Sequence, residues 1–200
     1  MTPITKVDDL KALYGEPVSA AIKKVVYEIT PLVRTWLGKS RFCILSTVGP
    51  EGTDGSPRGD QGPVVTELDK HTLLMPDWRG NNRLDTLLNI VRDGRISLAC
   101  LVPGSVTVLR INGTAVVTAD QGLRDRFAHN GKTPTTVIVI SIAEIFTQCG
   151  RAPLRSDLWG ADQTEGLPTV GDLLAEASNF EEGGKDYDAA WMARAKETLW

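Results

Sequence analysis

Apolar and polar residues follow different patterns in the middle and at the ends of this chain. Between residues 41 and 160, short β-branched runs are separated by Gly, Pro, Asn and Asp, which is typical of strands joined by tight turns. The stretch Gly49–Ser56 is rich in turn residues and is expected to be a loop. Gly113 lies inside a strand pattern and predicts a bulge or a close backbone approach. Six strands are predicted, over Phe42–Val48, Val64–Leu68, Thr72–Met75, Ile96–Val102, Val106–Thr118 and Thr135–Ile142.

Helical spacing of apolar residues marks the two ends of the chain and two segments within it. Thr5 and Asp8 resemble a capping box that opens a helix over Val7–Tyr14, and Gly15 closes that helix. Further helices are predicted from Ser19 to a break at Pro31, from Asn81 to Val91 with Leu84, Leu87, Leu88 and Val91 on one face, and over Gln121–His129, Pro168–Ser178 and Asp186–Leu199.

These elements predict an α+β fold, mainly β, in which six antiparallel strands close into a barrel with helices at both ends. Closure removes the sheet edges that so much β-branched sequence would otherwise expose. The chain divides accordingly into an N-terminal helical segment (1–40), a barrel domain (41–160) and a C-terminal helical extension (161–200) packed on the same domain.

Composition narrows the class of protein. With 200 residues, 42% of them hydrophobic and 24% charged, the chain has the make-up of a globular domain. No apolar run approaches a membrane span and the start, MTPITKVDDL, lacks a signal sequence, so a cytoplasmic protein without membrane contact is expected. Three scattered cysteines and two histidines, without C-x-x-C or H-E-x-x-H, predict neither a disulfide framework nor a metal site. A net charge of -3 speaks against nucleic-acid binding.

Arginine is concentrated in the predicted barrel. Eleven of the thirteen arginines lie between Arg41 and Arg155, where only Lys70 and Lys132 of the nine lysines occur. Arginine is the better bidentate ligand for phosphate or carboxylate. Either ion pairs between strands or an anionic ligand explains this distribution.

Two segments point to the ligand. In Met75–Leu88 (MPDWRGNNRLDTLL), a strand end, a glycine and two asparagines precede Arg83 in the first turn of a helix, which suits an anion. In Gly52–Gly62 (GTDGSPRGDQG), Arg58 lies between a turn and a strand, and Gly59 permits close backbone approach. A capped helix with a solvated arginine and a loop with a surface arginine explain the two segments equally well. Neither segment has the spacing of a Walker loop or a dinucleotide fingerprint.

Together with VLRINGTAVV and QCGRAPLRSDLW, these segments resemble the pyridoxamine 5'-phosphate oxidase-like flavoproteins, the FMN-binding split-barrel family. The similarity runs from about Phe42 to Trp159. Within the family, the chain looks most like a subgroup of FMN-dependent proteins without a settled substrate. The resemblance implies a six-stranded antiparallel split β-barrel and an FMN-dependent oxidoreductase with a small-molecule substrate or electron donor. It also implies a homodimer that holds FMN at the subunit interface.

The resemblance assigns roles to individual residues. Arg58 matches an arginine that enters the second strand and holds the FMN phosphate. Asn82 and Arg83 stand at the helix start where many relatives have Arg-Lys, and Arg79 would supply the missing charge. The implied cofactor contacts are Arg58, Gly59, Met75, Pro76, Arg79, Asn82, Arg83 and Gln148, the last reaching the cofactor of the partner subunit.

The chain departs from the family pattern in the residues that would bind the substrate. Authentic pyridoxamine 5'-phosphate oxidases end in an Arg/His motif, whereas residues 160–200 hold no histidine and only Arg194, so vitamin-B6 oxidation is not expected. Arg151 and Arg155 would either face a small anionic substrate or pair with Asp157 and the acidic tail. No catalytic acid or base is assigned.

Other interpretations of the chain stay open. One is a non-catalytic flavin- or haem-binding sensor or carrier, and another is a barrel that binds single-stranded nucleic acid, for which exposed aromatic residues on the strands would be needed. Trp78 and Trp159 flank the predicted site in the sequence and would either stack near the flavin or pack in the core. Cys43 and Cys100 lie in apolar strand patterns and are expected in the core.

Overall fold

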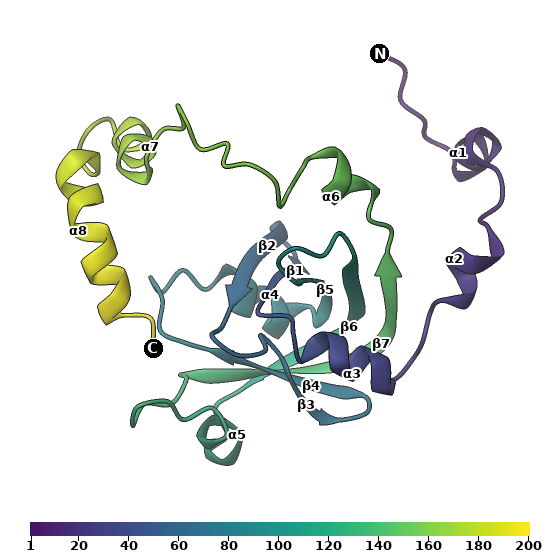
Figure 1. Ribbon diagram of the computed structural model, residues 1–200, viewed down its shortest axis with the longest axis horizontal. Helices are drawn as coiled ribbons and strands as arrows, with labels where there is room; N and C mark the ends of the chain where they lie inside the picture. The colour runs from purple at the N-terminus through teal and green to yellow at the C-terminus, as the bar shows by residue number, and fades with distance from the viewer.

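The computed structural model describes residues 1–200 and shows one antiparallel sheet with helices around it and at both ends (Figure 1). The predicted class, mainly β with helices, is confirmed. The strands are hydrogen-bonded in the order β2-β1-β5-β6-β7-β4-β3, so this is a split barrel with β2 and β3 at its open edges. The seven strands are β1 (Phe42–Gly49), β2 (Gly52–Gly59), β3 (Thr66–Asp69), β4 (Thr72–Asp77), β5 (Arg95–Leu101), β6 (Val108–Thr118) and β7 (Thr136–Gln148).

The strand missing from the prediction is β2. Its sequence, GTDGSPRG, has low strand propensity, and the local pattern therefore predicts a loop. In the structure these residues pair with β1 along its whole length, from Gly59 opposite Phe42 to Gly52 opposite Gly49, and the edge position tolerates Pro57. The closure that the strand pattern predicts does not occur, because no ladder joins β2 to β3, whereas the split barrel that the family resemblance implies is confirmed. Seven strands in an open sheet replace six in a closed barrel.

The two longest strands, β6 and β7, pair along most of their length in the middle of the sheet. β7 continues beyond the predicted end at Ile142 to Gln148, because β6 supplies partners as far as Val108. The ladder shifts register at Gly113, which confirms the predicted bulge. A Cβ at this position would collide with the carbonyl oxygen of Ser141, so the glycine permits an approach that keeps both strands paired.

The core lies inside the coiled sheet. Cys43 and Cys100 face each other on β1 and β5 and are fully buried, as predicted. The hydrogen bond with Cys43 and burial raise the pKa of the Cys100 thiol, which keeps it protonated. Large aliphatic side chains fill the rest of this core, among them Leu45, Leu98, Ile111, Ile138, Ile140 and Ile145.

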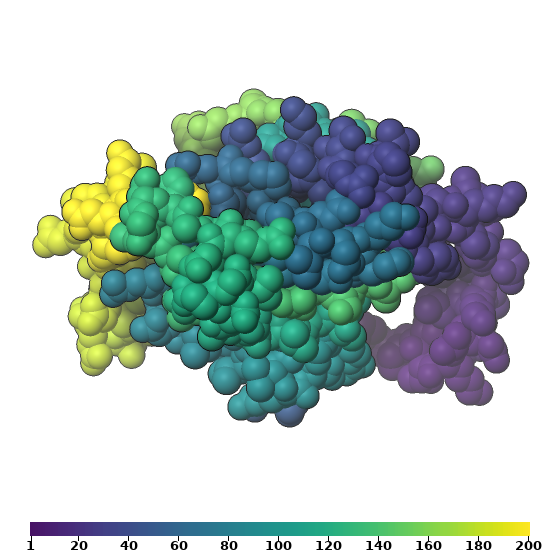
Figure 2. Space-filling model, turned by 90° about the horizontal axis from the view of Figure 1, so that it is seen from below, coloured from purple at the N-terminus to yellow at the C-terminus, as the bar shows by residue number.

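Helices decorate the sheet and extend beyond it. They are α1 (Val7–Tyr14), α2 (Ser19–Lys23), α3 (Pro31–Leu37), α4 (Asp85–Arg92), α5 (Gln121–Asp125), α6 (Arg151–Arg155), α7 (Val170–Ala177) and α8 (Gly184–Glu197). The sequence pattern does not predict α6, and α5 ends before the predicted end at His129. Figure 2 shows the two helical ends of the chain on opposite sides of the barrel.

The helical run predicted after Ser19 stops early. α2 ends at Lys23, because Val26 forms a bridge with Ile145 of β7 and so joins the sheet. Ile29 is then buried in the barrel core with 1% of its surface exposed. Tertiary pairing thus overrides the helical spacing of these apolar residues.

The helix boundaries near the N-terminus also differ from the prediction. Pro31 begins α3 instead of breaking a helix, because proline fits the first turn and the Thr30 hydroxyl accepts a hydrogen bond from a free N–H of that turn. The capping box predicted from Thr5 does not form, since Lys6 is the N-cap residue and no side chain caps α1. Gly15 ends α1 as predicted.

The helix after β4 starts later and turns a different face to the core than predicted. Asn82 has a left-handed backbone (φ 60°), and α4 begins only at Asp85. Asn89 is buried, and its Nδ2 donates to Thr47 Oγ1 of β1 at 3.1 Å. The predicted apolar face is therefore turned partly outward, with Leu84, Leu88 and Val91 exposed.

The two helices predicted near the end of the chain are present as α7 and α8, which pack against each other. A capping box between Thr169 and Asp172 opens α7. α8 has no buried residue, and Figure 1 shows both helices standing away from the sheet. Residues 161–200 are named the C-terminal arm below. None of the eight helices combines the length and the hydrophobicity that a membrane-spanning segment requires.

Candidate functional site

An ion pair joins the two halves of the split barrel. Arg58 on β2 donates from Nη1 to Asp77 Oδ1 at the end of β4, at 2.5 Å, and the two side chains are only 20% and 14% exposed. β2 and β4 lie far apart in the sheet order, so a side-chain contact bridges the split where no backbone ladder does. This contact fixes Arg58 on the wall of two adjoining pockets.

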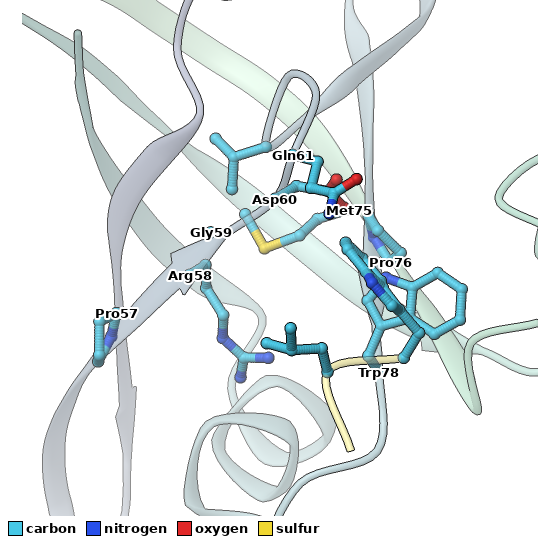
Figure 3. A pocket seen from close by; sticks show the side chains of 11 residues that line it. Pro57, Arg58, Gly59, Asp60, Gln61, Met75, Pro76 and Trp78 are labelled. Atoms are coloured by element: carbon cyan, nitrogen blue, oxygen red, sulfur yellow. The ribbon is translucent and has the colours of Figure 1, made fainter. Parts of the chain in front are cut away.

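The first pocket encloses about 370 Å³ and has an aromatic and apolar side. Figure 3 shows Arg58, Met75 and Trp78 around it. Strand β2 and the loop after it form one wall, β4 forms another, and the end of the C-terminal arm forms a third. The lining residues are Pro57, Arg58, Gly59, Asp60, Gln61, Val64, Met75, Pro76, Trp78, Leu199 and Trp200.

The second pocket, of about 380 Å³, adjoins the first, since Arg58 and Trp78 line both. Its lining is polar: Arg58, Arg79 and Arg83 share it with one carboxylate, Asp77. Most of the other lining residues come from the loop between β4 and α4 and from the start of β7. The two pockets together have a cationic end and an aromatic end.

The structure brings most of the predicted cofactor residues to these pockets. The first is lined by Arg58, Gly59, Met75 and Pro76, and the second by Arg58, Arg79, Asn82 and Arg83. Gln148 lines neither pocket and lies at the end of β7, opposite Val108. The predicted substrate residues Arg151 and Arg155 are exposed on α6, also line neither pocket, and form no ion pair.

The three arginines differ in the acids that neutralise them. Arg58 is paired with Asp77, whereas Arg83 is paired with Asp85 at 2.5 Å, and the hydrogen bond with Asp85 raises the pKa of Arg83. The Arg83 side chain is 78% exposed, so its ion pair contributes little to stability and yields readily to a stronger anion. No ion pair involves Arg79.

Unpartnered polar atoms gather at the same place. Four buried side-chain N or O atoms of the protein have no hydrogen-bond partner, and three of them belong to Arg58 (Nε), Trp78 (Nε1) and Thr136 (Oγ1), which line the pockets. Buried polar groups in folded proteins are almost always hydrogen-bonded. This concentration therefore points to a ligand with its own donors and acceptors.

Sequence reasoning missed four lining residues that come from distant segments: Thr135, Thr136, Leu199 and Trp200. Thr136 reaches the second pocket because the register of β4 and β7 places it opposite the end of β4. Trp200 reaches the first pocket from the end of the C-terminal arm, and no local pattern signals this. Of the two tryptophans that flank the site in the sequence, Trp78 lines both pockets, whereas Trp159 lines neither and donates Nε1–H to a backbone carbonyl at 2.8 Å.

An antiparallel split barrel with two adjoining pockets at its split defines the class of protein. The family model described as pyridoxamine 5'-phosphate oxidase matches residues 29–149, and the chain belongs to this family. The matched range contains every strand of the barrel and all pocket residues except those of the C-terminal arm. No curated protein matches the chain.

A solved structure, HupZ, shares this fold at low sequence identity. HupZ of Group A Streptococcus has a TM-score of 0.50 and 18% identity, over 60% of this chain and 93% of HupZ. A protein from Lactobacillus delbrueckii named for pyridoxamine 5'-phosphate oxidase has a TM-score of 0.47 and 22% identity, over 60% of this chain and 95% of its own. At 18% identity the similarity to HupZ concerns the fold alone.

Proposed function

We propose that this chain is an FMN-dependent oxidoreductase that binds the cofactor phosphate at the cationic end of the pocket pair and the flavin ring at the aromatic end. The proposal rests on the three unpartnered buried atoms, Arg58 Nε, Trp78 Nε1 and Thr136 Oγ1, at the walls that the predicted cofactor residues also line. These are two N–H donors and a hydroxyl, so the matching ligand carries several acceptors. FMN carries them both on its phosphate and on its ring.

The cationic end suits a phosphate group. Arg58 bonds Asp77 through Nη1 alone, so its Nε remains for a second acceptor while Asp77 holds the guanidinium in place. Arg79 and Arg83 supply two further cations to the same pocket. Charge-assisted bonds from guanidinium to phosphate are short and strong, and several of them converge here.

The aromatic end suits a flat heteroaromatic ring. Met75 is 1% exposed and presents its side chain to the pocket, and Trp78 offers both a ring and an unpartnered N–H. Ring stacking and sulfur–aromatic contacts stabilise a ring in such a place. When bound, FMN supplies the redox chemistry, while these residues bind the ring and orient it.

Phosphate recognition is tested by comparing FMN with riboflavin, which lacks the phosphate. Arg58→Ala should weaken FMN binding by about tenfold to a hundredfold, the worth of one charge-assisted hydrogen bond, and leave riboflavin binding unchanged. Arg83→Ala should act in the same direction. The matched control is Arg194→Ala, since this guanidinium lies on α8 over the Tyr187 ring, 4.6 Å from its centroid, outside both pockets.

Fluorescence titration of each flavin measures these affinities. Equal losses for FMN and riboflavin in Arg58→Ala would mean that the arginine is structural and that the phosphate lies elsewhere. The purified protein should also be yellow and release FMN on denaturation. A colourless protein that takes up no FMN in equilibrium dialysis would exclude the proposed function altogether.

Turnover and dimer formation complete the proposal. A nicotinamide or deazaflavin donor should reduce the bound flavin over repeated cycles, whereas a carrier would bind FMN without turnover. A two-fold homodimer with FMN at its interface would let Gln148 reach the partner's pocket, and cyclic dimers are the commonest assemblies. Sedimentation should show a dimer at micromolar concentration; a monomer with FMN bound would contradict this part of the proposal.

A further inference from the structure

A tight hairpin after α5 holds two side chains beside the first pocket. His129 and Lys132 exchange both backbone hydrogen bonds, at 2.9 and 3.0 Å, and Asn130 and Gly131 between them have φ values of 50° and 77°. Positive φ at both central positions defines a type I′ turn, for which Asn-Gly is the preferred sequence. Residues directly opposite in a hairpin present their side chains on one face. His129 and Lys132 therefore point the same way.

Both side chains contact Trp200 at the end of the C-terminal arm. The ring centroids of His129 and Trp200 are 4.8 Å apart, and Lys132 Nζ donates to the Trp200 carbonyl oxygen at 2.9 Å. Trp78 completes the enclosure, edge-on to Trp200 with centroids 5.2 Å apart and planes at 82°. In Figure 2 the yellow end of the arm lies against the green segment that contains this hairpin. Trp78 and His129 thus contact the Trp200 indole, and Lys132 binds the carbonyl oxygen of the same residue.

Trp200 stands between the proposed flavin ring and this hairpin. It lines the first pocket, and it also lines a neighbouring pocket of about 270 Å³ whose walls include Phe127, His129 and Gln61. A substrate of the proposed flavin must lie next to the flavin ring. The Trp200 indole fills such a position.

The arm that carries Trp200 is only weakly attached to the barrel. α8 has no buried residue and packs chiefly against α7, and Leu199 is 56% exposed. Trp200 itself is half-buried. Segments with few buried apolar contacts open at a low cost in free energy. A small molecule that makes the same contacts can therefore displace this indole.

We propose that the space filled by the Trp200 indole is a substrate subsite. The subsite binds a flat aromatic ring that is joined by a short chain to a carboxylate. Trp200 competes with this ligand for the subsite. Trp78 and His129 hold the ring, and Lys132 binds the carboxylate. The role of the ligand as substrate rests on the proposed flavin site, whereas its binding does not. Lys132, rather than the arginines of α6, then recognises the anionic group of the substrate.

Indole-3-propionate is the probe, because it copies Trp200 from the ring to the carbonyl carbon. By isothermal titration, Trp200→Ala should bind the probe about tenfold or more tighter than the unchanged chain, since the competing indole is gone. Adding Lys132→Met should remove about tenfold of that affinity, the worth of a hydrogen bond to a charged group. Lys39→Met, an exposed lysine outside these pockets, should change nothing. 3-Ethylindole, which lacks the carboxylate, should not respond to Lys132→Met.

Several results would overturn the subsite: no binding to Trp200→Ala, equal affinity in both chains, or no effect of Lys132→Met. A second measurement needs no variant. Millimolar probe should raise hydrogen exchange in α8 of the unchanged chain, as read by mass spectrometry, and unaltered exchange would show that Trp200 is not displaced. FMN titration of the same proteins separates the two proposals. FMN binding without probe binding rejects the subsite alone, and probe binding without FMN binding rejects the flavin assignment alone.

Discussion

The barrel and the C-terminal arm both carry amphipathic patterns, but only the barrel converts them into burial. Of the 27 buried residues, all but Pro153 and Gly171 lie between Ile29 and Ile145. In the arm, apolar side chains such as Leu173 and Phe180 are 55% and 84% exposed. The pattern along the chain defines a strand or a helix, whereas burial requires a second surface facing it. The difference shows that stability and shape come from the barrel.

The barrel and the C-terminal arm also contribute different kinds of residue to the pocket walls. The barrel supplies walls of buried or ion-paired side chains, such as Met75 and the Arg58–Asp77 pair, while the arm supplies Trp200, which follows the weakly attached helix α8. Binding residues on rigid elements are positioned more precisely than those on mobile segments. This arrangement suits the two proposals made above, in which FMN stays bound to the barrel while Trp200 gives way to an exchanging substrate.

Core leucines should show the largest difference between the two regions. Leu98 in β5 is fully buried, and Leu98→Ala should lower the free energy of unfolding by about 2–5 kcal/mol, through lost burial and the cavity left behind. Leu173→Ala in α7 should change it by less than about 0.5 kcal/mol. Urea denaturation measures both. Comparable losses would show that the arm belongs to the same cooperative unit as the barrel.

Two glycines test the close approach of β6 and β7. Gly113→Ala should cost about 1–3 kcal/mol or more, because its Cβ would meet the Ser141 carbonyl oxygen and force the strands apart. Gly55→Ala, on the edge strand β2, has open space around its Cβ and an ordinary φ, so it should be neutral or slightly stabilising. Thermal unfolding of both variants decides the matter, and equal melting temperatures would contradict the bulge argument.

Thr30 and Thr169 each cap the N-terminus of a helix with the side-chain hydroxyl, one in the barrel and one in the C-terminal arm. Thr30→Ala should lower barrel stability by about 1 kcal/mol, because α3 packs its Leu37 into the core. Thr169→Ala should loosen α7 by a similar amount without changing the main unfolding transition. Melting curves report the first effect and hydrogen exchange the second. A lower melting temperature in Thr169→Ala would mean that the arm supports the barrel.

The smallest expected effect is a pH dependence at the start of β5. The side-chain hydrogen bond from Arg95, followed by that from its backbone N–H, lowers the pKa of Asp93 from 3.8 to about 2. A pKa that is depressed in the folded state stabilises the protein above the unfolded value, and the contribution is lost as pH falls from about 4 to about 2. Arg95→Gln should flatten the melting profile within this window only.

A carboxyl of the arm gives the matched control. Hydrogen bonds from Thr164 lower the pKa of Asp162, so Thr164→Val removes the side-chain part of that shift. Because the arm packs little against the barrel, the variant should leave the main transition unchanged from pH 5 to pH 2. A flattened profile in Thr164→Val, or an unaltered one in Arg95→Gln, would contradict the separation of the two regions.

Local sequence by itself determined the strands with continuous β-branched runs, the bulge at Gly113, the bounds of α1 and the cluster of arginines around Arg58 and Arg83. Each of these depends on residues that are neighbours in the chain, through their backbone preferences and the spacing of apolar side chains. The motifs from Gly52 to Leu88 therefore indicated most of the pocket residues. The resemblance built on them indicated the family.

Tertiary structure alone decided the other features. β2 is a strand only because β1 offers it a complete ladder, and α2 ends at Lys23 because Val26 finds a partner in β7. Thr136 and Trp200 reach the pockets through strand register and the path of the arm, which no local spacing encodes. In each case a hydrogen bond or a contact from a distant segment outweighs a local preference of about 1 kcal/mol per residue or less, and the position of that distant segment is a property of the whole fold.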